Sequence, residues 1–140
     1  MQPQSETPAL FRRDPQARAV PVVFDSPHSG RDYPPDFRPS APLELIRRSE
    51  DAYVEELYSA APLRGAVLLG ALFPRAYIDA NRSLADLDPL MIEGGWPGAQ
   101  TGEKSARGIG LIWRLLPPDI AIYDRLLTRE EVTRRIEQYW

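Results

Sequence analysis

The chain has 140 residues, of which 43% are hydrophobic and 26% charged, as expected for one globular domain. Its net charge of −3 and the lack of a basic block argue against nucleic acid as a partner. The absence of cysteine excludes disulfides and thiolate metal ligands, which leaves histidine, aspartate and glutamate as the metal-binding residue types. No signal-peptide pattern and no apolar run long enough to span a bilayer is visible, so we expect a cytoplasmic protein with no membrane partner.

The first 18 residues are polar and without periodicity, and we expect them to form a flexible lead. Residues 19–24 are apolar and rich in β-branched side chains, which predicts a buried strand. The loop that follows contains His28, the only histidine of the chain. In α/β sheets this edge is where ligands bind, and imidazole is a frequent metal ligand and proton carrier. The alternative is an ordinary turn with a solvated imidazole.

A helix is predicted over residues 49–61, with Ser49 as its N-cap. Its apolar face would consist of Val54, Leu57, Tyr58 and Ala61. An advance of about 100° per residue places Asp51 on that face, where a carboxylate needs a metal, an arginine or the helix's own amides as partner. Glu50 lies nearer the centre of the face if the helix begins earlier, so the pattern leaves the choice between the two carboxylates open.

Two further strands are predicted at residues 65–73 and 76–78. The second is followed directly by Asp79, Asn81 and Arg82, which would bring strong hydrogen-bonding groups to one edge of the sheet. Such residues also occur in ordinary turns.

Residues 89–110 hold most of the nine glycines and show no helical pattern, which is typical of a lid or a binding loop. Apolar segments at 110–113 and 120–123 predict a hairpin. Thr128 and Glu131 form a capping box that opens a last helix. Its apolar face continues to the end of the sequence, so we expect an incomplete fold whose remaining elements follow the C-terminus.

Four stretches together resemble the N-formylglutamate amidohydrolase family. They are Ser26-Pro27-His28-Ser29-Gly30 with Tyr33-Pro34; Glu50-Asp51-Ala52-Tyr53-Val54-Glu55-Glu56-Leu57; Phe73-Pro74-Arg75-Ala76-Tyr77-Ile78-Asp79-Ala80-Asn81-Arg82 with Leu87-Asp88-Pro89; and Gly108-Ile109-Gly110 through Ile122-Tyr123 to Glu131, Arg135-Ile136 and Tyr139-Trp140.

The resemblance implies an α/β fold with a mixed sheet flanked by helices, similar to the zinc-dependent carboxypeptidases. Residues 19–140 would be the N-terminal part of a single amidohydrolase-like domain. The reaction implied is hydrolysis of the formyl amide of N-formyl-L-glutamate to formate and glutamate, at the end of a histidine-degradation route. A divalent metal would be required, with zinc as the expected ion.

Carried over by position, His28 and Asp51 would bind the metal, which favours Asp51 over Glu50. Arg75, Asn81 and Arg82 would bind the carboxylates of a small acidic substrate. The family's further histidine ligand and its general base would lie outside this chain. We therefore expect the 140 residues alone to bind metal weakly and to turn over little substrate.

The sequence is also compatible with two other functions. The first is a hydrolase of another N-acyl amino acid or peptide on the same fold. The second is a non-catalytic module that binds a carboxylate ligand or a partner protein through Arg75 and Arg82. The sequence does not specify an oligomeric state.

Overall fold

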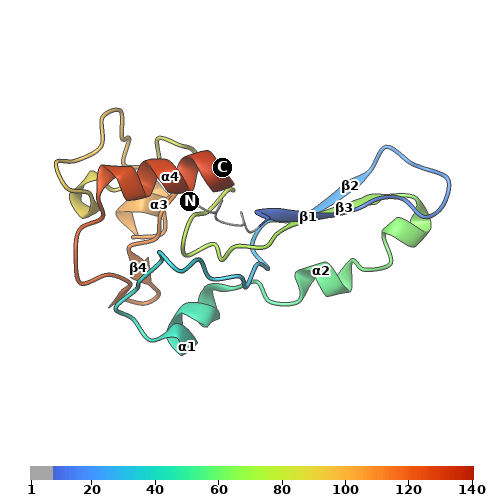
Figure 1. Ribbon diagram of the computed structural model, residues 1–140, viewed down its shortest axis with the longest axis horizontal. Helices are drawn as coiled ribbons and strands as arrows, with labels where there is room; N and C mark the ends of the chain where they lie inside the picture. The colour runs from blue at the N-terminus through green and yellow to red at the C-terminus, as the bar shows by residue number, and fades with distance from the viewer. Residues whose placement is uncertain (1–7) are drawn as a thin grey trace, which may run out of the picture.

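The structure is a computed structural model that describes residues 8–140. Figure 1 shows an elongated molecule, with a small sheet towards one end and most of the helices at the other. The polypeptide that leaves the central strand of the sheet runs into the helical part. The fold is mixed α/β, as predicted.

The sheet has three strands in the order β1-β3-β2. They are β1 (Leu10–Arg13), β2 (Val23–Ser26) and β3 (Val67–Ala71). β3 is central, antiparallel to β1 and parallel to β2, so the sheet is mixed.

Two expectations for this sheet are corrected by the structure. Residues 10–13, expected within a flexible lead, form the edge strand β1, while the first seven residues of that lead lie outside the described part. The strand predicted at 19–24 is shifted to β2, and it is not buried: the side chain of Val23 is 62% exposed. Both strands are at sheet edges, where one side of the ladder has no partner.

The helix predicted over 49–61 does not form. Within the segment lie only the last residue of η1 (Arg47–Ser49) and the four-residue helix α2 (Val54–Leu57), and η2 (Pro62–Arg64) follows it. Glu50 is extended, Tyr53 has a φ of +66°, and the Ser49 hydroxyl donates to the Ile46 carbonyl of the preceding helix rather than capping a new one. The proposed apolar face is largely solvated, since Leu57 is 81% exposed.

The remaining elements form the helical part. They are α1 (Leu43–Ile46), η3 (Pro89–Met91), α3 (Glu103–Ala106), β4 (Leu115–Leu116), β5 (Ile120–Ala121) and α4 (Arg129–Tyr139). β4 and β5 form a hairpin across Pro117-Pro118, as predicted, but β4 lies after the segment 110–113 that was expected to form the first strand, and β5 covers only the first half of 120–123. The strand predicted at 76–78 is a turn.

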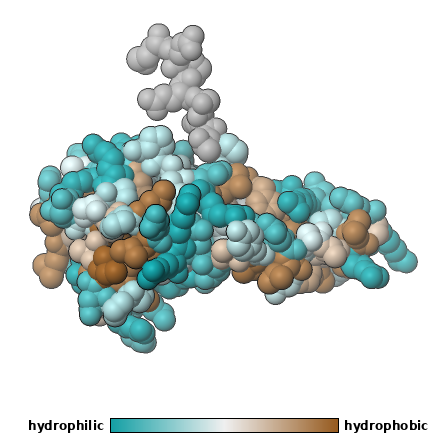
Figure 2. All heavy atoms as spheres, turned by 90° about the horizontal axis from the view of Figure 1, so that it is seen from below, coloured by the Kyte–Doolittle hydropathy of each residue, from teal (hydrophilic) through white to brown (hydrophobic). Residues whose placement is uncertain are grey.

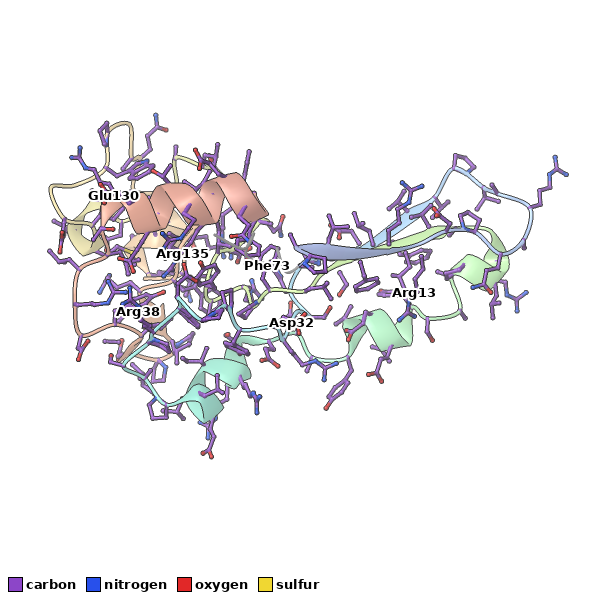
Figure 3. The ribbon with its side chains drawn as sticks, in the orientation of Figure 1. Arg13, Asp32, Arg38, Phe73, Glu130 and Arg135 are labelled. Carbon is purple, nitrogen blue, oxygen red and sulfur yellow. The ribbon has the colours of Figure 1, made fainter. Side chains whose placement is uncertain are left out.

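The core of the helical part surrounds a fully buried arginine, Arg135 of α4, which Figure 3 labels beneath the helix. Its guanidinium lies 4.1 Å from the ring centroid of Tyr77 and also packs against Phe37 and Tyr123. Nη1 donates to the Tyr77 carbonyl and to the Tyr123 hydroxyl. α4 is therefore fixed to the turn that leads into Asp79.

The predicted capping box of α4 is present and supports a stability prediction. Glu131 accepts a hydrogen bond from the Thr128 amide, and Glu131 Oε1 lies 2.7 Å from Arg125 Nη2. The hydrogen bonds from Arg125 are the largest cause that lowers the pKa of Glu131 from 4.5 to about 2. Because the folded-state pKa lies below the unfolded one, this stabilisation is complete above the unfolded pKa and is lost as the pH falls through the folded pKa.

We expect Glu131→Gln to lower the free energy of unfolding by about 2 kcal/mol at neutral pH. The variant should also show a weaker loss of stability between about pH 5 and pH 2 than the unmodified chain. Urea denaturation at a series of pH values measures both. Glu130→Gln changes an exposed carboxylate in the same turn and should have little effect; equal effects of the two substitutions would contradict the prediction.

Candidate functional site

The loop after β2 carries His28 against the polypeptide that leaves β3. The backbone of this loop approaches residues 72–73 closely: a Cβ atom at Gly30 would lie 2.2 Å from the Phe73 carbonyl oxygen. The Asp32 amide also donates to the Leu72 carbonyl, at 2.8 Å. These backbone contacts hold the histidine loop beside the segment that delivers Arg75 and Asp79.

The imidazole of His28 lies between two carboxylates. Its Nε2 is 2.8 Å from Asp79 Oδ1, and its Nδ1 is 3.2 Å from Asp51 Oδ2. Asp79 is fully buried, whereas the side chain of Asp51 is 50% exposed. Both ring nitrogens therefore lie within hydrogen-bonding distance of a carboxylate oxygen, and the shorter, more buried contact is the one with Asp79.

Asp51 and Glu50, between which the helix pattern did not decide, have different neighbours. Asp51 lies at the site, where its amide donates to the His28 carbonyl at 3.0 Å. Glu50 accepts a hydrogen bond from the Tyr33 hydroxyl at 2.5 Å. The interruption of the helix between residues 50 and 53 is what brings Asp51 to the imidazole. Of the three partners considered for this carboxylate, the structure places an arginine beside it, Arg75.

Arg75 bridges the two aspartates. Its Nη1 donates to both oxygens of Asp51, at 3.3 and 3.2 Å, and its Nη2 donates to Asp79 Oδ2 at 3.2 Å. The guanidinium carbon lies 5.0 Å from the ring centroid of Trp113, whose Nε1 lies 3.4 Å from Asp79 Oδ2. Trp113 thus packs against Arg75 and contacts the carboxylate that Arg75 binds.

The other two predicted substrate-binding residues are placed differently. Arg82 has its Nη2 at 3.6 Å from Asp79 Oδ2, while its Nε and Nη1 donate to the carbonyls of Ile109 and Asn81. Asn81 is exposed and lines a separate cavity next to Trp140. The structure therefore brings Arg75 and Arg82 to one carboxylate and leaves the Asn81 side chain beside another surface.

Asp79 is the central residue that the sequence reasoning assigned no role. Burial raises the pKa of Asp79, but the hydrogen bond from His28 and the charges of His28, Arg75 and Arg82 together outweigh it, so the pKa lies below its usual value. The only sequence signal was its position in the cluster before Asn81. Its contact with His28 joins residues 51 positions apart.

A cavity of about 270 Å³ opens beside Asp51 and Arg75. Its walls combine these charged residues and Arg48 with apolar side chains, which are Leu45, Trp113, Leu116, Pro117 and Ile120. Figure 2 shows the molecule from below, with apolar surface interrupted by polar side chains in the helical part as well as in the sheet part. The site thus offers an open cavity with a carboxylate and an arginine at its edge.

The donor set fits part of a metal site. His28 Nδ1 and Asp51 form one pair of ligand atoms, and the contact between Nε2 and Asp79 matches the carboxylate that commonly orients a metal-bound histidine. The two aspartates approach opposite ring nitrogens, so they cannot share one ion through His28. Accordingly, residues 8–140 contain no group of three or more histidine, aspartate or glutamate side chains that could hold a metal.

No helix in the described part of the chain is long and apolar enough to cross a membrane.

Comparisons with known proteins agree on one family. The family model described as N-formylglutamate amidohydrolase matches residues 20–140. The crystal structure of N-formylglutamate amidohydrolase from Ralstonia eutropha JMP134 is 46% identical in sequence and superimposes with a TM-score of 0.90. The match covers 95% of this chain and 48% of that one, so the chain spans about half the length of this relative. No curated protein sequence matches significantly.

Proposed function

Because this chain belongs to the N-formylglutamate amidohydrolase family, as its motifs predicted, we propose that it supplies part of the active site of a metal-dependent amidohydrolase. The substrate is N-formyl-L-glutamate and the products are formate and glutamate. We also propose that the complete domain has a fold similar to the zinc-dependent carboxypeptidases. The reaction would belong to histidine degradation in the cytoplasm.

One observation carries the proposal: a single histidine is held between a buried and an exposed aspartate at the edge of a cavity. A histidine with a purely structural role does not need a solvent-facing carboxylate at its second nitrogen. His28 and Asp51 would hold a divalent metal, with zinc as the ion that imidazole and carboxylate ligands suit. Asp79 would keep the Nε2 proton in place and the ring oriented.

The chemistry follows from these residue types. A bound divalent metal would polarise the formamide carbonyl and make water a stronger nucleophile near neutral pH. Arg75 and Arg82 supply guanidinium groups that bind carboxylates in a planar, bidentate manner and orient the substrate. Asn81 would take part only where the substrate reaches the neighbouring surface. The general base is not among the residues that we assign.

Zinc titrated calorimetrically into the purified chain tests the proposal. We expect weak binding, since only two protein ligands are present where catalytic zinc sites usually have three. His28→Ala should abolish the binding, and Asp51→Asn should weaken it at least about tenfold. Glu50→Gln is the matched control, because this neighbouring carboxylate binds Tyr33 instead. Binding that is indifferent to His28 would contradict the proposal and favour a non-catalytic module.

Formate release from N-formyl-L-glutamate tests the reaction. We expect little turnover by the 140 residues even with zinc, because the donor set is incomplete. Robust turnover would show that the site needs no further groups. A full-length family member that carries the same His28 and Asp51 pair should lose formate release when either residue is replaced.

A second substrate class is favoured by the cavity walls. Five of the lining residues are apolar, and the space exceeds what a formyl group needs. An N-acyl amino acid with an apolar acyl group or side chain would bury that group against Trp113 and Leu116. Comparing the release of formate from formyl-glutamate and formyl-leucine by a full-length family member separates the two classes.

A further inference from the structure

Arg75 uses the same carboxylate oxygen that faces the candidate metal ligand. Asp51 Oδ2 lies 3.2 Å from His28 Nδ1 and 3.2 Å from Arg75 Nη1. The guanidinium thus compensates the charge of the exposed aspartate at the position where a cation would contact it. Arg75 has the same kind of contact with Asp79, at 3.2 Å through its other terminal nitrogen.

The guanidinium is held in a way that leaves one donor unused. Its Nε is buried and has no hydrogen-bond partner, although the side chain is 14% exposed and lines the 270 Å³ cavity. A buried donor without a partner costs free energy, so the guanidinium is not fully satisfied in this position. Trp113 packs against the guanidinium and Asp79 anchors it from the other side.

We propose that Arg75 competes with a divalent cation for Asp51 and turns to the carboxylate of an acidic ligand when the cation binds. This inference rests on the proposed metal site and adds a property to it: the cation and the acidic ligand bind cooperatively. A dication at Asp51 repels a guanidinium at this distance and takes the oxygen that Arg75 holds. The released Nη1 then donates to the carboxylate of the ligand, while Nη2 stays on Asp79.

An arginine near the site can weaken cation binding in two ways: through its positive charge alone, or by occupying the carboxylate of Asp51. Arg82 provides the matched control within the same chain. Its side chain is also 14% exposed and its Nη2 lies 3.6 Å from Asp79, but it has no contact with Asp51. Removing either arginine lowers the positive charge near His28 by one, whereas only the loss of Arg75 frees the metal-facing carboxylate.

Calorimetric titration of zinc into the chain and its Arg75→Gln and Arg82→Gln variants tests the competition. We expect Arg75→Gln to bind zinc about fivefold more tightly and Arg82→Gln to change the affinity less than about twofold. Arg75→Lys, which keeps the charge but cannot bridge both aspartates, should fall between the two. Circular dichroism confirms that each variant is folded. Equal gains in both glutamine variants, or weaker binding by Arg75→Gln, would overturn the proposal.

The cooperativity is tested with glutarate, a dicarboxylate that cannot be hydrolysed. Glutarate should bind more tightly to the zinc-loaded chain than to the metal-free chain, and zinc should gain the same factor in the presence of glutarate. Arg75→Gln should remove this coupling. If His28→Ala leaves zinc binding unchanged, the proposed metal site itself is wrong. If His28→Ala abolishes binding but Arg75→Gln changes neither affinity nor coupling, only the competition is wrong.

Discussion

Asp79→Asn is expected to weaken zinc binding by about 10- to 100-fold while the chain stays folded. Asparagine has nearly the same shape but no charge, so it cannot hold the Nε2 proton of His28 as a carboxylate does. An asparagine whose amide group faces Nε2 would favour the opposite tautomer, with the proton on the nitrogen that should bind the metal. The substitution also deprives Arg75 and Arg82 of their shared negative partner.

Calorimetric zinc titration measures this effect, and urea denaturation shows how much stability is lost. Asp88→Asn is the control, because Asp88 is also buried and pairs with an arginine, Arg114, but has no contact with His28. We expect the control to lose some stability and no zinc affinity. A similar loss of affinity in both variants would mean that Asp79 acts through the fold and not through the histidine.

Local sequence signals predicted the elements whose contacts are local. The capping box of Thr128 and Glu131 lies within four residues and correctly marked the start of α4. The β4–β5 hairpin joins strands a few residues apart. The apolar run that became β3 was also identified, since all five residues of this central strand are apolar and each is buried or partly buried.

The helix predicted over residues 49–61 failed because contacts distant in sequence decide this segment. Ser49 is a good N-cap and the apolar spacing is helical. A continuous helix, however, would hold the backbone of Asp51 in its first turn. In the structure Asp51 is held by the His28 backbone and by Arg75, residues 23 and 24 positions away. Local preference was overridden at the site itself, where conflicts between local and global structure are expected.

The site was predicted only in part for the same reason. His28 stood out as the only histidine, and the resemblance selected Asp51 over Glu50. Asp79, by contrast, looked like one of several polar residues after a strand. Its role depends on burial and on the approach of the His28 loop, and neither can be derived from the residues around position 79. The edge strand β1 was missed because its pairing with β3 is distant and only two of its four residues are apolar.

Gly30→Ala is expected to lower the free energy of unfolding by at least about 3 kcal/mol, a fall in Tm on the order of 10 °C. The added Cβ would lie 2.2 Å from the Phe73 carbonyl oxygen and 2.5 Å from the Leu72 carbonyl carbon. Both atoms are backbone, so no side-chain rotation can relieve the overlap. Differential scanning calorimetry measures the loss.

Gly95→Ala separates this steric effect from the general cost of replacing a glycine. Gly95 has a φ of +71° and no atom within 4 Å of an added Cβ, so the change should cost only about 1 kcal/mol of backbone strain. Gly30→Ala should in addition lose zinc binding, because the histidine loop must move away from residues 72–73 and carry His28 away from Asp79. A variant that melts early but binds zinc normally would show that the loop packing stabilises the fold without positioning the site. Loss of both properties would show that one backbone contact does both, which is how a chain with a single histidine can fix that residue between two distant aspartates.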